Sequence, residues 1–207
     1  QLSNLLDALA GLNGGKVISE LDLLALLRAS RDAVLVGGQA VAFWVAYFKL
    51  EIPSGPEAFI SREADFLGIA ADVERFSKAI GGRAVYPDKR DLGARIGAVL
   101  VATQSGDEIG VDVLRSVVGL NADAVRTRAI PIADPADRDF AFKVMHPIDC
   151  MVGRFENLRI LAEKQNEVGV WQARLSILIC RAYIEALIVG ADEREAIKSA
   201  TKILEVA

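Results

Sequence analysis

The chain has 207 residues, of which 52% are hydrophobic and 25% are charged, and its formal net charge at pH 7 is −4. This length and hydrophobicity predict one folded domain, or slightly more, with a sizeable core. The negative charge excludes a general electrostatic attraction to nucleic acid, so such a partner would need a local basic patch. One His and two Cys argue against a zinc site.

Hydropathy and cysteine usage favour a cytoplasmic protein. The chain has no run of about 18 uncharged apolar residues, so we expect no membrane span. Its first residues lack a basic region followed by an apolar run, so we expect no secretion signal. Cys150 and Cys180 lie in apolar, helix-like sequence, which favours packing in a reducing cytosol over the alternative of a disulfide between them.

The first 80 residues predict helices around short apolar strands. Leucines at helical spacing favour helices over 3–12 and 18–29. Residues 33–36 form an apolar run before Gly37-Gly38, which indicates a buried strand and a tight turn. The elements expected next are an almost wholly apolar helix over 39–50, a loop containing Pro53, Gly55 and Pro56, a strand over 63–69 and a helix over 71–80.

The middle of the chain favours strands and its last third favours helices. Strands are predicted over 83–86, 94–102 and 108–114, with a hairpin turn at 105–107 between the last two. Residues 115–127 are ambiguous, and one more short strand over 128–132 is ended by the polar segment 133–139. The last third predicts helices over 147–163, 168–189 and 192–205. We therefore predict an α+β fold, with a sheet-containing domain over 1–145 and a C-terminal helical subdomain over 146–207.

Two acids one residue apart mark the second strand as the candidate site. Alternate residues of a strand point to the same face, so the carboxylates of Glu63 and Asp65 are expected to lie together. Carboxylates that close repel each other unless a cation lies between them, and Mg²⁺ takes one or two carboxylates with substrate phosphates. The alternative is that the two acids form an exposed strand face.

Two further features are expected near this pair. Glycines in the Val36-Gly37-Gly38 turn allow a ligand close to the backbone, and the N-terminus of the following helix presents free N–H groups to phosphate. Asp112 is a lone acid between apolar residues on a predicted strand, so it needs a partner if buried. That partner is either a metal ion or one of the arginines Arg95 and Arg115.

This order of motifs resembles the nucleotidyltransferase superfamily with the polymerase-beta-like fold, over roughly residues 30–185. The resemblance rests on Val36-Gly37-Gly38, Glu63-Ala64-Asp65-Phe66 and Val111-Asp112-Val113. It extends in particular to bacterial stand-alone members that include abortive-infection toxins of toxin–antitoxin pairs. The segment His146-Pro147-Ile148-Asp149-Cys150 is also similar to one in such proteins. The resemblance implies a mixed β-sheet flanked by helices and followed by a C-terminal helical bundle.

The resemblance also implies metal-dependent transfer of a nucleoside monophosphate from an NTP to an acceptor hydroxyl on a protein, an RNA or a small molecule. Glu63 and Asp65 would ligate Mg²⁺ or Mn²⁺, and Asp112 would complete the site or take the acceptor's proton. Gly37 and Gly38 would hold the triphosphate, and an antitoxin protein would be a partner. Glu63 departs from the family pattern, which commonly has Asp there, and its longer side chain shifts the oxygens.

Three other residues have two interpretations each. Arg154 and Lys164 suit phosphate or acceptor binding, or they lie on a solvated helix face. His146, the single His, precedes Pro147 and favours anchoring of a helix over contact with substrate. For the whole protein, the alternatives to an enzyme are a catalytically inactive module that binds nucleotide or a partner protein, and an unrelated α/β protein whose acids pair with arginines.

Overall fold

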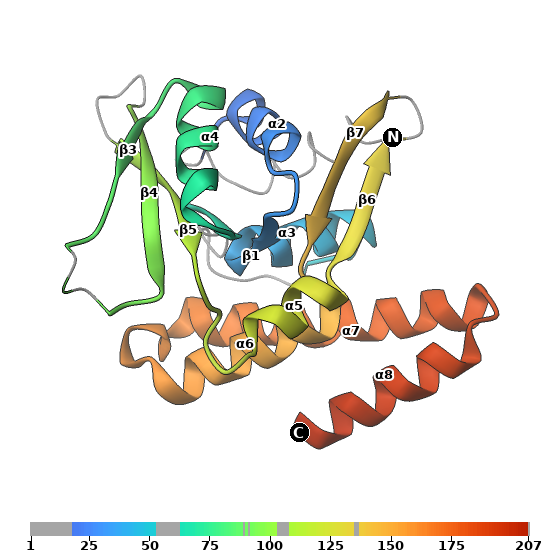
Figure 1. Cartoon of the computed structure of the whole chain (residues 1–207). Helices are drawn as coiled ribbons and strands as arrows, with labels where there is room; N and C mark the ends of the chain where they lie inside the picture. The colour runs from blue at the N-terminus through green and yellow to red at the C-terminus, as the bar shows by residue number, and fades with distance from the viewer. Residues whose placement is uncertain are drawn as a thin grey trace.

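The computed structural model describes residues 18–52, 63–88, 90, 92–102, 108–134 and 137–206, except for the side chains of Arg138, Asp139 and Val206. Within these residues the chain forms a seven-stranded mixed sheet with seven α-helices and one 3-10 helix (Figure 1), which confirms the α+β class. The helix predicted over 3–12, the loop with Pro53, Gly55 and Pro56, and the hairpin turn at 105–107 lie outside the described residues.

The strands form one sheet in the order β3-β4-β5-β2-β1-β7-β6. Their bounds are β1 Val34–Val36, β2 Ala64–Leu67, β3 Arg83–Val85, β4 Arg95–Ala102, β5 Glu108–Leu114, β6 Ile130–Asp134 and β7 Asp137–Val144. The two parallel pairs are β1 with β7 and β2 with β5, and the other neighbours are antiparallel. The sheet centre is therefore built from segments that are far apart in sequence.

One strand contradicts the sequence analysis, which ended the strand region in the polar segment 133–139. The structure continues from β6 into β7, and these two strands pair antiparallel from Ile130 opposite Val144 to Asp134 opposite Asp137. The side chains of Phe140, Phe142 and Val144 alternate into the core, which is the reason that this segment adds a strand despite its charged start.

The predicted helices with described residues are present, with small shifts of their ends. Their bounds are α2 Glu20–Ala29, α3 Gly37–Tyr47, α4 Ala70–Ile80, α5 Ala122–Arg128, α6 Pro147–Ile160, η1 Ala162–Lys164, α7 Glu167–Val189 and α8 Glu193–Val206. The ambiguous segment 115–127 contains most of α5, and α3 begins at Gly37, before the expected start. In Figure 1, α6, α7 and α8 lie along one side of the molecule, and α2 and α4 lie together on the other.

Helix α3 lies at the centre of the core, and its neighbours explain its apolar sequence. A helix that is apolar all round is buried all round, and Phe43 and Trp44 of α3 are almost fully buried. One continuous cluster of apolar side chains joins α3 and the sheet to α7 through Leu175 and Ile179. The division into 1–145 and 146–207 stays a prediction. None of the described helices has the length and apolarity needed to span a lipid bilayer.

His146 anchors the start of α6, as one interpretation of the sequence predicted. Its Nδ1 accepts a hydrogen bond from the backbone N–H of Ile148 at 3.2 Å, and Pro147 occupies the first turn of the helix. Burial lowers the pKa of His146 to about 4, and the opposing effect of Asp149 is smaller. Cys150 and Cys180, also in this region, are buried and form no disulfide, and each thiol donates to a backbone carbonyl, that of Met145 and of Pro147 respectively.

We expect His146→Asn to reduce the loss of the free energy of unfolding as the pH falls below about 6.5. The imidazole is neutral in the folded state but gains a proton near its ordinary pKa of 6.5 when unfolded, so stability is full above about pH 6.5 and falls toward pH 4. Asparagine keeps the cap but cannot titrate. Urea unfolding of both proteins at pH 7 and pH 5 should show that the wild type loses about 2 kcal/mol more. Equal losses would contradict a buried neutral His146.

Candidate functional site

The parallel pairing of β2 with β5 brings two of the predicted acids side by side. Asp65 is the register partner of Asp112, and Ala64 is the partner of Val111. Glu63 comes directly before β2 and is exposed. A Cβ built on Gly110 would lie 3.6 Å from Oε1 of Glu63, so the Glu63 side chain lies over β5 where that strand has no side chain of its own. The three acids therefore share one region of the sheet.

Gly37 places the N-terminus of α3 directly against Asp65. Val36 of β1 is the register partner of Asp65, and the next residue, Gly37, has a φ of +68°. A Cβ at Gly37 would overlap Oδ2 of Asp65 and lie 2.8 Å from its carboxyl carbon. The turn thus requires glycine for its φ and for its contact with the carboxylate. No side chain caps α3, whose first N–H groups lack intrahelical acceptors.

The surroundings of Asp65 disfavour its negative charge. Burial raises the pKa of Asp65 to about 7, and the negative charges of Asp112 and Glu63 also raise it. The positive charges of Arg154 and Lys164 act in the opposite direction but are outweighed. A carboxyl group in this condition is stabilised as an anion by any added cation, which is the property expected of a cation ligand.

Asp112 has the arginine partner that the sequence analysis kept as an alternative. Nη1 of Arg95, on the neighbouring strand β4, lies 3.4 Å from Oδ1 of Asp112, whose side chain is 18% exposed. Within the described ranges, no three His, Cys, Asp or Glu side chains are grouped closely enough to hold a metal ion. The carboxylates of Asp65 and Asp112 are adjacent in register, but they do not form a three-acid cluster with Glu63.

The two predicted phosphate-binding cations lie on the helical side of Asp65. Arg154 of α6 is partly buried, and its Nη1 donates to Oε1 of Gln172 of α7 at 2.8 Å. Lys164 is exposed in η1. The positive charges of both residues lower the pKa of Asp65, so each acts on the charge at that residue.

Two residues that position charged groups in this structure, Gln172 and Asp149, were not predicted from the sequence as functional residues. Gln172 orients Arg154, and no pattern around it in the sequence indicated a partner. Asp149 of α6 is fully buried and accepts two hydrogen bonds from Arg128 at the end of α5, at 3.0 and 2.8 Å. The sequence does contain a pattern that indicates a buried, paired acid at this position, because Asp149 is a lone acid among apolar residues, as Asp112 is.

Compared with known proteins, the chain matches no protein-family model and no curated protein.

Proposed function

We propose that the protein is a nucleotidyltransferase that moves a nucleoside monophosphate from an NTP to an acceptor hydroxyl. The observation that carries the proposal is the contact between Gly37 and the carboxylate of Asp65, with Asp112 next to Asp65 in register. It sets a glycine turn and an uncapped helix N-terminus, which suit phosphate, against two acids that suit a divalent cation. The positive charges of Arg154 and Lys164 also act on Asp65.

The ligands that the chain supplies fit Mg²⁺ or Mn²⁺ only when the ion is also bound by the phosphates of the substrate. Mg²⁺ is commonly bound through one or two carboxylates plus substrate phosphates, and Asp65 and Asp112 supply that number. Glu63 would join them by a change of rotamer, since it is exposed beside Gly110. Such an ion supplies charge neutralisation at the phosphates and at the attacking oxygen.

The residues of the chain have separate tasks in the proposed transfer. The N–H groups of Gly37 and Gly38 bind phosphate oxygens, and Arg154 and Lys164 balance their charge. The acceptor oxygen forms a bond to the α-phosphorus while the bond to pyrophosphate breaks. Asp112 takes the proton that leaves the acceptor hydroxyl, and Arg95 beside it holds its carboxylate on this face.

We extend the proposal to the fold, as a nucleotidyltransferase-like sheet followed by a C-terminal helical bundle. The support is the order of the elements along the chain. Strand β1 is followed by a glycine turn and α3, then by β2, which carries Asp65 and pairs antiparallel with β1, and later by β5, which carries Asp112 and pairs parallel with β2. Helices α6, α7 and α8 pack on one another, and α3 packs against α6 and α7.

Labelled NTPs test the proposed activity. Wild-type protein is incubated with each α-labelled NTP, Mg²⁺ or Mn²⁺, and protein, RNA and small-molecule acceptors. We expect label transfer that Asp65→Asn lowers by at least about 100-fold, because the ion loses a ligand. Asp123→Asn is the matched control, since Asp123 is 93% exposed and pairs only with Arg126 of its own helix among the described residues. Transfer that survives Asp65→Asn, or no transfer with any NTP, metal and acceptor tried, would overturn the proposal.

A second candidate is a catalytically inactive module of the same fold that binds nucleotide or a partner protein. The observation in its favour is that Arg95 already neutralises Asp112 and no three-acid group is formed in the described parts of the chain. This candidate predicts a rise in Tm with NTP and metal but no label transfer. A biological role as the toxin of a toxin–antitoxin pair stays a prediction, and growth arrest on expression that Asp65→Asn abolishes would support it.

A further inference from the structure

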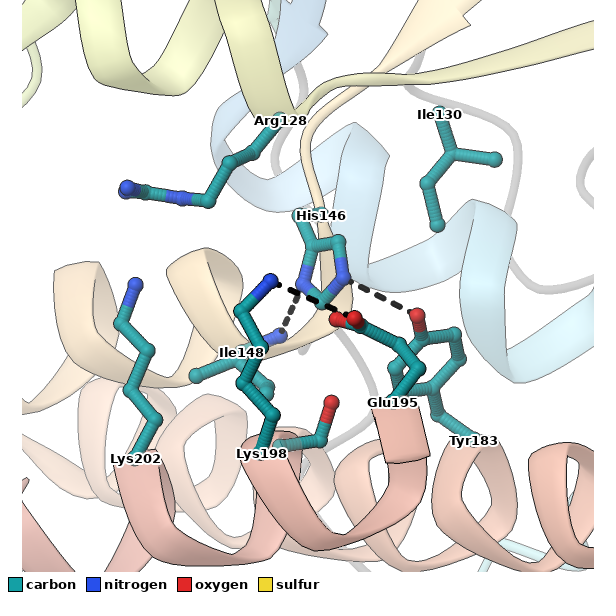
Figure 2. Close-up of a pocket in the computed structure, with 9 residues that line it drawn as sticks. Arg128, Ile130, His146, Ile148, Tyr183, Glu195, Lys198 and Lys202 are labelled. Atoms are coloured by element: carbon teal, nitrogen blue, oxygen red, sulfur yellow. Dashed lines mark hydrogen bonds and ion pairs between the residues drawn. The ribbon is translucent and has the colours of Figure 1, made fainter. Parts of the chain in front are cut away.

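A pocket of about 400 Å³ lies away from the acid pair, between the end of α5, the start of α6, and helices α7 and α8. Figure 2 shows its walls, with Arg128 on one side and Glu195, Lys198 and Lys202 rising from α8 on the other. These positions of α8, together with Ser199, recur at spacings of three and four residues and so share one helix face. The volume is in the range of small-molecule sites.

Cations dominate the polar groups of this pocket. Arg128, Lys198 and Lys202 line it, and Glu195 is the single carboxylate among the lining residues. Lys198 Nζ lies 3.2 Å from Glu195. Asp149 lies beneath the wall, where Arg128 binds it through two hydrogen bonds and Lys202 Nζ lies 3.4 Å away. Asp192, the other acid nearby, accepts from the backbone N–H of Glu195 at the start of α8.

Two hydroxyl groups in the pocket have protons to donate. The side chain of Ser199 is 2% exposed, and its Oγ has no hydrogen-bond partner among the described residues. Tyr183 Oη lies 3.1 Å from Nε2 of His146 (Figure 2). Because Nδ1 of His146 accepts from Ile148 N–H, the neutral ring carries its proton on Nε2 and donates it to Tyr183. The Tyr183 O–H is therefore available to an acceptor in the pocket.

Apolar side chains complete the walls and define the rest of the ligand. Ile130 of β6 and Ile148 of α6 line the pocket beside the donors.

Burial raises the pKa of Tyr183, and Glu195 and Asp192 raise it further, so its hydroxyl keeps its proton at neutral pH. The site thus combines two neutral O–H donors, three cations and an apolar wall.

We propose that this pocket binds a small phosphomonoester, with its phosphate on Lys198, Lys202, Arg128 and the hydroxyls of Ser199 and Tyr183, and its organic part against Ile130 and Ile148. Phosphate has enough acceptor oxygens for these donors, and arginine and lysine are its usual partners. The site is separate from the acid pair and does not depend on the proposed transfer reaction.

Calorimetric titration with phenyl phosphate, in the absence of metal, tests the proposal. We expect wild type to bind, and Lys198→Gln and Ser199→Ala each to weaken binding by about tenfold, since each loses a bond to a charged ligand. Ser199→Ala removes only an unpaired hydroxyl, so its folding is retained. Lys78→Gln, the same charge change on an exposed residue of α4, should bind as wild type does.

Two further titrations distinguish binding in this pocket from binding elsewhere on the protein. Lys164→Gln, which removes a cation that the proposed function places beside the acid pair, should bind phenyl phosphate as tightly as wild type, and loss of binding in this variant alone would assign the phosphate to the acid pair instead. Benzoate should bind at least about tenfold more weakly, because a carboxylate has fewer acceptor oxygens. No binding by wild type, equal binding by benzoate, or unchanged binding by both pocket variants would overturn the proposal.

Discussion

Gly37→Ala is expected to lower the free energy of unfolding by about 3 kcal/mol and the proposed nucleotide transfer by at least about 100-fold. The φ of +68° costs an alanine about 1 kcal/mol, and the added Cβ would overlap Oδ2 of Asp65. Either the carboxylate or the start of α3 must move. Urea unfolding and the labelled-NTP assay measure the two effects.

Gly81→Ala is a matched control for the backbone part of this effect. Gly81 ends α4 with a φ of +64°, and a Cβ there would meet nothing within 4 Å. It should therefore show the cost of the left-handed backbone alone, about 1 kcal/mol, and no loss of transfer.

A double-mutant cycle isolates the contact between Gly37 and Asp65. In an Asp65→Ala background the carboxyl group is gone, but the Cβ of residue 65 remains and would lie 2.9 Å from the added Cβ, so Gly37→Ala should cost less than in the wild type but more than Gly81→Ala does. A cost of Gly37→Ala that is the same with and without the Asp65 carboxylate would contradict the contact.

Asp149→Ala is expected to lower the free energy of unfolding by about 4 kcal/mol. Asp149 is fully buried, and the change leaves the guanidinium of Arg128 without the carboxylate that accepts its two hydrogen bonds. Lys202, on α8, loses the same partner. Because domains of this size are stable by only about 5 to 15 kcal/mol, the variant should unfold at markedly lower urea concentration.

Two comparisons give this prediction its control. Asp123→Ala removes a carboxylate that also pairs with an arginine, but one that is 93% exposed, so we expect no measurable change in urea midpoint. Changing Arg128 to Met in the Asp149→Leu background should restore part of the lost stability, since Lys202, whose side chain is 34% exposed, is then the one described partner of Asp149 still left without the carboxylate. A midpoint shift for Asp149→Ala as small as that for Asp123→Ala would show that the buried ion pair adds nothing.

Local patterns were sufficient to predict most of the sheet and helices. The apolar run at 33–36 and the helix before Gly81 formed where expected, because each needs only its own hydrophobic pattern and a glycine at its end. Strand β7 was missed because Asp137, with two charged residues after it, obscured the alternation of Phe140, Phe142 and Val144. Its pairing with β6 and β1 overrides that charged start.

The candidate site was predictable only in part, because no single strand specifies which strands will be its neighbours. Alternation placed Glu63 and Asp65 on one face, but pairing with β5 decides that Asp112 lies beside Asp65. The bond from Arg95 to Asp112 follows from the antiparallel pairing of β4 with β5. The pocket beside His146 could not be predicted, because four helices and a strand contribute to it and no short motif contains its lining residues.

The interior position of β1 in the sheet has a consequence for biosynthesis. Val34 pairs with Lys143, and Leu35 accepts a hydrogen bond from the backbone N–H of Met145, so this strand gains its second neighbour only when residues beyond 140 have emerged. At ordinary rates of translation, β1 is without that neighbour for roughly 5 to 20 seconds. Arg154 and Gln172 follow later still. We therefore expect unfinished chains to lack the proposed transfer activity, so that a ribosome stalled before these residues releases no fragment that carries it.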